Sequence, residues 1–262
     1  MTKVREIAKI IEDYAPVGLQ EDYDNAGLQV GNLDMDVSAV LLCLDVTEDI
    51  LQEAIDRRCN LIVSHHPLIF RGLKSVTGRD AVQRIVIKAI QNKVAIYAAH
   101  TNLDSAHEGV SREIGHILNL TNMSVLDPKP GDDSVGIGII GDMAPTPKIE
   151  FLRRLKDKFN VKALRYSAHS PRLVIKRPAV CGGAGAFLIK RAIEMGADAI
   201  VTGDVKYHDF TSFGEEILIA DIGHYESELC TRKIFSRIIR DAFPEMVIYF
   251  SETESSPIAT LY

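Results

Sequence analysis

Two stretches of the chain resemble one another, and together they decide the fold. The first is LCLDVTEDILQEAIDRRCNLIVS, residues 42–64, and the second is VCGGAGAFLIKRAIEMGADAIVT, residues 180–202. They align without a gap at an offset of 138 residues, and the identical positions are Cys43, Ala54, Ile55, Ile62 and Val63 with Cys181, Ala192, Ile193, Ile200 and Val201. The repeat indicates an internal duplication.

Each copy has the pattern of a strand, a helix and a second strand. An apolar run is followed by a helical pattern, over 48–57 or 186–195, and then by a second apolar run, over 61–63 or 199–201. This order predicts parallel strands joined by a right-handed crossover. Short strands made of Val, Ile and Leu are typical of a sheet covered on both faces. We therefore predict an α/β protein of two similar α/β domains that face each other across a cleft.

The segment 126–147 is the best candidate for a domain boundary. It carries four prolines around a single strand-like run, residues 135–140, and such punctuation is typical of a connection between domains. We expect a first α/β domain from residues 1–126 and 222–262, and a second from residues 127–221.

Composition and charge exclude several classes of protein. Hydrophobic residues make up 46% and charged residues 25% of the 262 residues, as in ordinary globular chains. Residues 1–14 have the spacing of an amphipathic helix rather than of a signal peptide, and no apolar run approaches the roughly 20 residues of a membrane span. We expect a cytoplasmic protein with no membrane partner. The net charge of -6 disfavours a general electrostatic grip on nucleic acid.

The four cysteines are scattered without a CxxC pair, which argues against a thiolate zinc site and against a secreted disulfide framework. We expect them to be buried as small hydrophobic residues.

Histidine and carboxylate side chains follow three predicted strands at their carboxyl ends. His65 and His66 come directly after the run 61–63, His100 and Asp104 come after the strand that ends at Ala99, and His224 follows the strand 217–220. Open α/β sheets place their sites at these ends. This convergence predicts a metal site.

The spacing favours two ions over one. Neighbouring side chains in extended backbone diverge, so His65 and His66 would serve different ions. His224 and Glu228 stand four residues apart on an expected helix that runs to about residue 240, and can reach one site together. Asp104 offers two oxygens and is the natural bridge. The predicted metal ligands are His65, His66, Asp104, His224 and Glu228.

Imidazole and carboxylate without thiolate suit zinc, iron, manganese or cobalt better than magnesium or calcium. These ligands are too few to saturate two divalent ions, so water fills the open positions. Because a metal ion lowers the pKa of bound water toward neutrality, hydrolysis is the default chemistry.

Other residues near the predicted site leave alternatives open. His100 could be a ligand, a donor that holds a carboxylate, or a proton shuttle. Tyr207 and His208 occupy the place that the two metal histidines hold in the first copy, so His208 could contact substrate, but an ordinary polar loop is equally consistent. We take His100 and His208 as the catalytic candidates. The glycine-rich turn 181–185 could hold an anion, although a tight turn with close helix packing is favoured.

Several motifs together resemble the dinuclear-metal NIF-three-like family, whose members are commonly labelled GTP cyclohydrolase I type II homologues. The motifs are Ser64-His65-His66-Pro67, His100-Thr101-Asn102-Leu103-Asp104, Thr202-Gly203-Asp204, Gly223-His224-Tyr225-Glu226-Ser227-Glu228 and Asp22-Tyr23-Asp24-Asn25-Ala26-Gly27-Leu28. The likeness spans nearly the whole chain. Tyr23 departs from it, because the family often has Trp there.

The resemblance implies a pair of similar α/β domains, two metal ions on the five predicted ligands, and self-association into a homohexameric ring, as a trimer of dimers or as stacked trimers. It favours a metal-dependent hydrolase of a small nucleotide-like or phosphorylated substrate, of which GTP cyclohydrolase chemistry is one version. The alternative is a non-catalytic metal-binding or interaction protein with a structural or regulatory metal site. A ring that surrounds nucleic acid is a third interpretation, and the acidic composition disfavours it.

Overall fold

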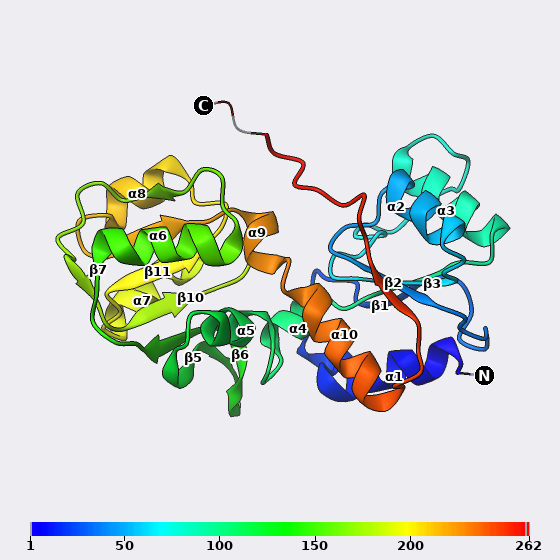
Figure 1. Cartoon of the computed structure of the whole chain (residues 1–262), viewed down its shortest axis with the longest axis horizontal. Coiled ribbons are helices and arrows are strands. Elements are labelled where there is room, and N and C mark those ends of the chain that lie inside the picture. The colour runs from blue at the N-terminus through cyan, green and yellow to red at the C-terminus, as the bar shows by residue number, and fades with distance from the viewer. Residues whose placement is uncertain (1, 260, 262) are drawn as a thin grey trace. The chain divides into compact units, whose positions relative to one another are not determined.

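The computed structural model describes residues 2–259 and residue 261, and it divides the chain into two compact units (Figure 1). Unit 1 consists of the residues up to Ala106 together with Thr231–Ser255. Unit 2 consists of His107–Cys230 and the end of the chain from Ser256. Each unit has its own sheet and its own core.

Unit 1 contains a five-stranded sheet in the order β1-β4-β3-β2-β13. Strands β13, β2, β3 and β4 are parallel neighbours, and β1 runs antiparallel to β4. The elements of this unit are α1 (Val4–Tyr14), η1 (Val17–Leu19), β1 (Gly27–Val30), β2 (Val40–Cys43), α2 (Glu48–Asp56), β3 (Leu61–Ser64), α3 (Ala81–Gln91), β4 (Ala95–Ala98), α4 (Thr101–Ser105), α10 (Thr231–Ala242) and β13 (Ile248–Phe250).

Helices cover both faces of this sheet (Figure 1). On one face, Ile62 of β3 lies in the same buried cluster as Ile50 of α2 and Ile85 of α3. On the other face, α1 and α10 pack together, and the Tyr97 hydroxyl of β4 donates to Glu12 of α1 over 3.0 Å. Since successive side chains of a strand point to opposite faces, this double cover explains why β2, β3 and β4 are buried at every residue.

Unit 2 contains a six-stranded sheet in the order β5-β6-β10-β11-β12-β8, and a separate pair, β7 with β9. Strands β10, β11 and β12 are parallel, and β6 and β8 flank them in antiparallel pairing. The elements are α5 (Val110–Ile117), β5 (Thr121–Lys129), β6 (Asp132–Asp142), β7 (Thr146–Pro147), α6 (Lys148–Phe159), β8 (Arg165–Tyr166), β9 (Val174–Ile175), β10 (Pro178–Val180), η2 (Ala186–Leu188), α7 (Ile189–Glu194), β11 (Ala199–Thr202), α8 (Tyr207–Phe213), β12 (Leu218–Asp221) and α9 (His224–Glu228).

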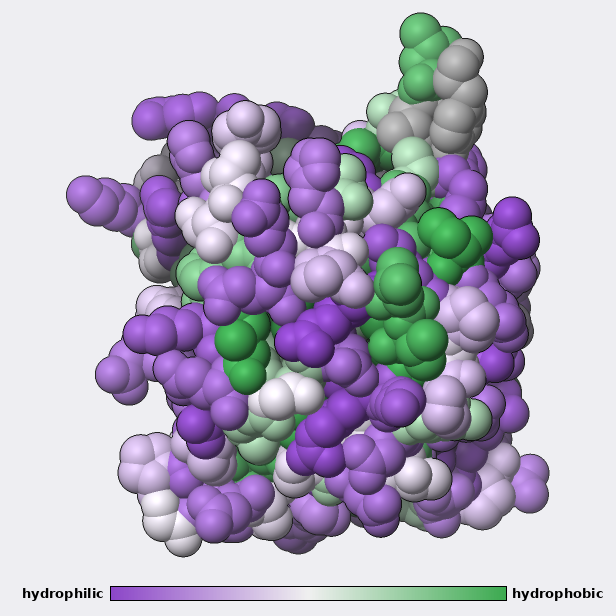
Figure 2. Space-filling model, turned by 90° about the vertical axis from the view of Figure 1, so that its left-hand side faces the viewer, coloured by the Kyte–Doolittle hydropathy of each residue, from purple (hydrophilic) through white to green (hydrophobic). Residues whose placement is uncertain are grey.

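The core of unit 2 lies between its sheet and the helices α7 and α8. Ile140, Ile200 and Ile219 of three strands share a buried cluster with Ile189 of α7, and Phe210 of α8 packs against it. Helix α5 packs on β6 and β10. Figure 2 shows one face of unit 2, where hydrophobic residues form separate patches among hydrophilic ones.

The α/β fold predicted from the sequence is confirmed. Residues 42–64 and 180–202 each begin at the end of a strand and continue through a helix to a parallel strand, β2-α2-β3 in one case and β10-α7-β11 in the other. The duplication itself stays an interpretation, and so does a cleft between two domains.

The chain passes from unit 1 to unit 2 after Ala106 and returns to unit 1 after Cys230, whereas the predicted domain boundaries lie at residues 126 and 222. Helix α5 and the whole of β5 lie in unit 2 because α5 packs on β6 and β5 pairs with β6 along most of its length. The segment with four prolines is thus largely a hairpin within one unit. The predicted boundaries between domains stay a prediction.

The structure corrects the predicted extent of one helix. The sequence pattern predicts a single helix from His224 to about residue 240, whereas the structure has α9 and α10, separated by Leu229 and Cys230. The break coincides with the change from unit 2 to unit 1 after Cys230.

All four cysteines are buried, as predicted, with 7% or less of each residue exposed. Within the described part of the chain, no helix is both long enough and apolar enough to cross a membrane.

The segment after β13 is tied to unit 1 by a buried carboxylate. Glu53 of α2 accepts hydrogen bonds from the Ser251 and Thr253 hydroxyls and from the backbone N–H groups of Glu252 and Thr253. Burial alone would raise the pKa of Glu53, but these bonds outweigh it and lower that pKa from 4.5 to about 2. The ionised carboxylate therefore stabilises the folded unit.

We expect Glu53→Gln to lower the free energy of unfolding by about 1–3 kcal/mol at neutral pH, since a buried charged acceptor of several hydrogen bonds is lost. Because the pKa is lower in the folded state, the stabilisation is present above pH 4.5 and is lost as pH falls from 4.5 toward about 2. Urea unfolding across this range should show a steeper acid loss in the wild type than in the variant.

Glu252→Gln is the matched control, because the Glu252 side chain is 77% exposed and forms a surface ion pair with Arg57. It should change stability by less than about 1 kcal/mol. Equal effects of the two variants would contradict the role given to Glu53.

Candidate metal centre

Three histidines meet in unit 1 at the carboxyl ends of two neighbouring strands. His65 and His66 follow β3, and His100 follows β4, which is parallel to β3. The centroids of the three rings are 5.2, 5.3 and 5.4 Å apart, and one ligand atom from each ring lies within 4.8 Å of the others. The group could hold a metal ion.

Each of these imidazoles is held through its Nδ1 atom. His65 Nδ1 lies 2.9 Å from the Ala99 carbonyl oxygen, and His66 Nδ1 and His100 Nδ1 lie 2.8 Å from carboxylate oxygens of Asp45 and Asp24. Because these oxygens accept, Nδ1 carries the hydrogen, and in the neutral ring Nε2 keeps its lone pair. A hydrogen-bonded Nδ1 with a metal on Nε2 is the usual arrangement of protein metal ligands.

Asp104 lies beside His65, with 3.6 Å between its Oδ1 and His65 Nε2. It belongs to the short helix α4, whose first turn is fixed by side chains. Asp24 accepts hydrogen bonds from the backbone and hydroxyl of Thr101, and Asn102 accepts from the backbone N–H of His100. The same Asp24 therefore orients His100 and the helix that carries Asp104.

Asp24 is ionised throughout the neutral range. Its side chain is 0% exposed, and burial alone would raise its pKa. The hydrogen bonds from His100 and Thr101 outweigh burial and hold the pKa of Asp24 well below its usual range. The carboxylate thus remains a strong acceptor for both partners.

Unit 2 presents a second pair of candidate ligands on α9, which follows β12. His224 Nδ1 lies 2.8 Å from Asp204 Oδ2, and His224 Nε2 lies 3.0 Å from Glu228 Oε2. The hydrogen bond with Glu228 is the largest cause that raises the pKa of His224 to about 9. A cation bound to Nε2 and Glu228 would replace the proton in this arrangement.

The glycine-rich turn before η2 makes room for Glu228. A Cβ atom on Gly183 would lie 2.1 Å from Glu228 Oε1, and Gly183 has a φ of +60°. Its N–H donates to Ser227 over 2.9 Å, and the N–H of Gly185 donates to Thr202 over 2.8 Å. These occupied donors favour the tight turn over an anion site.

The structure thus brings His65, His66 and Asp104 together in unit 1 and adds His100 to them, and it pairs His224 with Glu228 in unit 2. His208 lies exposed on α8, with its ring 5.4 Å from that of Tyr207. The assignment of these residues as ligands and catalytic groups stays a prediction. Sequence reasoning missed the orienting roles of Asp24, Asp45 and Asp204.

Comparison with known proteins gives a consistent result. The model of the family described as Duf34/NIF3 (NGG1p interacting factor 3) matches residues 2–257. Two relatives are named GTP cyclohydrolase 1 type 2 homolog. The one from Clostridium perfringens is 38% identical over 86% of this chain and 87% of its own, and the one from Clostridium acetobutylicum is 34% identical over 94% and 92%. The crystal structure of the hypothetical protein SA1388 from Staphylococcus aureus is similar with a TM-score of 0.90 at 26% identity, over 99% of both chains.

We expect Asp24→Ala to weaken zinc binding roughly 10- to 100-fold, the usual effect of removing a group that orients a ligand. Calorimetric titration with Zn²⁺ should show the loss. Asp22→Ala is the control, because Asp22 is an exposed carboxylate on the same loop. Unchanged affinity in Asp24→Ala, with the fold intact, would contradict this role.

We also expect Gly183→Ala to displace the Glu228 carboxylate and to weaken zinc binding. Gly196→Ala is a matched control, because Gly196 also has a positive φ, of +78°, but nothing lies within 4 Å of its Cβ position. Both variants should lose about 1–2 kcal/mol of stability through backbone strain. Only Gly183→Ala should also lose affinity, and equal affinities would count against the predicted role of Glu228.

Proposed function

The chain belongs to the Duf34/NIF3 family, and on this premise we propose that it is a metal-dependent hydrolase that uses two divalent metal ions to activate water. The residues that would hold the ions are His65, His66, Asp104, His224 and Glu228, among which Asp104 would offer two carboxylate oxygens. Zinc, iron and manganese are the candidate metals, since the donors are imidazole and carboxylate without thiolate.

One observation carries the proposal. All four histidines of the two candidate groups, His65, His66, His100 and His224, have Nδ1 hydrogen-bonded to an oxygen acceptor. The exposed His107 also has Nδ1 near a carbonyl oxygen, that of Ser134, so the hydrogen bond alone does not identify a ligand. The four histidines differ from it because each lies in a group of possible ligand atoms, and metal ligands are oriented so that Nε2 faces the ion. The fully buried His65 supports the same interpretation.

The side chains of this protein would hold the ions and position the substrate, and none of them would itself attack the substrate. When bound, the ions supply Lewis acidity that lowers the pKa of water and stabilises negative charge on a reacting oxygen. Asp24, Asp45 and Asp204 would orient the imidazoles. His100 would be a further ligand or a proton carrier beside the ions, and His208 would contact the substrate.

We propose a small nucleotide-like or phosphorylated molecule as substrate. Two relatives are named GTP cyclohydrolase 1 type 2 homolog, so GTP is the first compound to test. That reaction would open the purine ring at a carbon and release formate. A homohexameric ring remains the predicted state of association.

The test is elemental analysis of the purified protein, followed by a screen of GTP, other nucleotides and phosphoesters. We expect His65→Ala and Asp104→Ala to retain less metal and to lose at least about 100-fold in turnover. His116→Ala is the control, because His116 is exposed and lies 3.2 Å from Glu108 on the surface of unit 2.

If the His65→Ala variant turns over substrate as fast as the wild type, the proposal of a metal-dependent hydrolase is overturned. A different outcome favours a structural metal site: a chelator lowers the melting temperature strongly while no substrate of the screen is consumed.

A further inference from the structure

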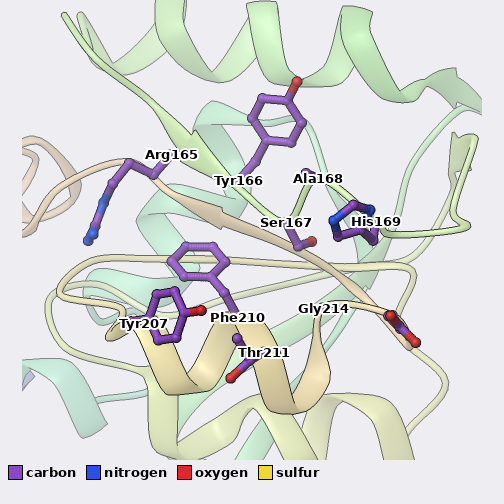
Figure 3. A pocket seen from close by; sticks show the side chains of 10 residues that line it. Arg165, Tyr166, Ser167, Ala168, His169, Tyr207, Phe210, Thr211 and Gly214 are labelled. Carbon is purple, nitrogen blue, oxygen red and sulfur yellow. The ribbon is translucent and has the colours of Figure 1, made fainter.

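A cavity of about 640 Å³ lies in unit 2 between the edge strand β8 and helix α8 (Figure 3). Its size is within the range of small-molecule sites. We propose that this cavity binds a nucleobase, as the free base or as the base of a nucleoside. Its lining includes Arg165, Tyr166, His169, Tyr207, Phe210 and Glu215.

Three aromatic rings, those of Tyr166, Tyr207 and Phe210, line the cavity. Tyr207 is 74% exposed and Tyr166 is 43% exposed, although large aromatic side chains are mostly buried. Phe210 packs against the core of the unit, so it provides a fixed ring behind Tyr207. The exposed Tyr207 ring beside the fixed Phe210 ring suits a planar ligand, because every base has a face that stacks on aromatic side chains. The Tyr166 ring points away from these two rings (Figure 3).

The walls of the cavity are preformed. Ser167 is buried, and its hydroxyl donates to the Ile217 carbonyl over 3.2 Å and accepts from the Ile219 N–H over 2.9 Å. A Cβ atom on Gly214 would lie 2.9 Å from Ser167 Cβ, so glycine allows the end of α8 to approach the loop after β8. A rigid site loses less entropy when a ligand binds.

The charges of the side chains around the cavity favour a nucleobase over a phosphate as the ligand. The Arg165 guanidinium donates through Nη2 to the Val205 carbonyl and to the buried Asp221 carboxylate, and lies 5.8 Å from the Phe210 ring centroid. Asp221 offsets the positive charge of Arg165, and Glu215 adds a negative charge to the lining. Such a site does not attract an anion.

The polar groups suit the edge of a heteroaromatic ring instead. Of the three guanidinium nitrogens of Arg165, only Nη2 donates a hydrogen bond to another described residue. Nε and Nη1 can therefore donate to a ligand. Glu215 can accept from ring N–H or amino groups, and His169 offers one donor and one acceptor. Donors and acceptors around a stacking surface recognise a base by its edge.

The experiment is calorimetric titration of the full-length, chelator-treated protein with guanosine, adenosine, their 5′-monophosphates and inorganic phosphate. We expect at least one nucleoside to bind saturably, its monophosphate to bind no more tightly, and phosphate not to compete. Tyr207→Ala should weaken binding roughly 5- to 150-fold, the range of base stacking on one aromatic ring. Tyr207→Phe should keep most of the affinity.

Phe187→Ala is the matched control, because Phe187 is a 63% exposed aromatic side chain of the same unit and does not line this cavity. Absence of saturable nucleoside binding, equal affinity in Tyr207→Ala and the wild type, equal losses in Phe187→Ala, or competition by phosphate would each overturn the proposal. Metal-free protein and His65→Ala should still bind the nucleoside, so this result is independent of the proposed hydrolase.

Discussion

The hydrogen bond at Nδ1 of each candidate histidine is the interaction on which the candidate metal centre depends. An imidazole on a flexible loop presents either nitrogen, and its ring turns freely. Here a carbonyl or a carboxylate selects the tautomer and the direction of the ring for His65, His66, His100 and His224. The ring atoms that would face a cation are thereby determined by residues that are not candidate ligands themselves.

The sheet of unit 1 makes these bonds available. Because β3 and β4 are parallel neighbours, the residues that follow them leave the sheet at the same edge. The carbonyl that holds His65 belongs to Ala99, directly after β4, so the end of one strand orients a candidate ligand that follows the neighbouring strand. Asp24 adds a third segment of chain, which connects the start of α4 to His100.

Much of this arrangement follows from local patterns. Apolar runs that end in histidine or aspartate predicted that His65, His66, His100 and Asp104 gather in one place, because strand ends converge in any parallel sheet. The orienting carboxylates could not be predicted in this way. Asp24 contacts His100 across 76 residues of sequence and Asp45 contacts His66 across 21, and a carboxylate in a loop carries no periodic signal. The break between α9 and α10 was missed because polar and apolar residues continue at helical spacing across it.

The discontinuity of unit 1 has a consequence for how the protein is made. Helix α10 and strand β13 complete the core and the sheet of this unit, yet they come after all the sheet strands of unit 2. On the ribosome, unit 2 can complete its sheet once β12 has emerged. At that point one face of the unit 1 sheet still lacks α10, and β2 still lacks its neighbour β13. The sheet that starts first along the chain is therefore completed last, and until α10 and β13 emerge its apolar surface is a target for chaperones.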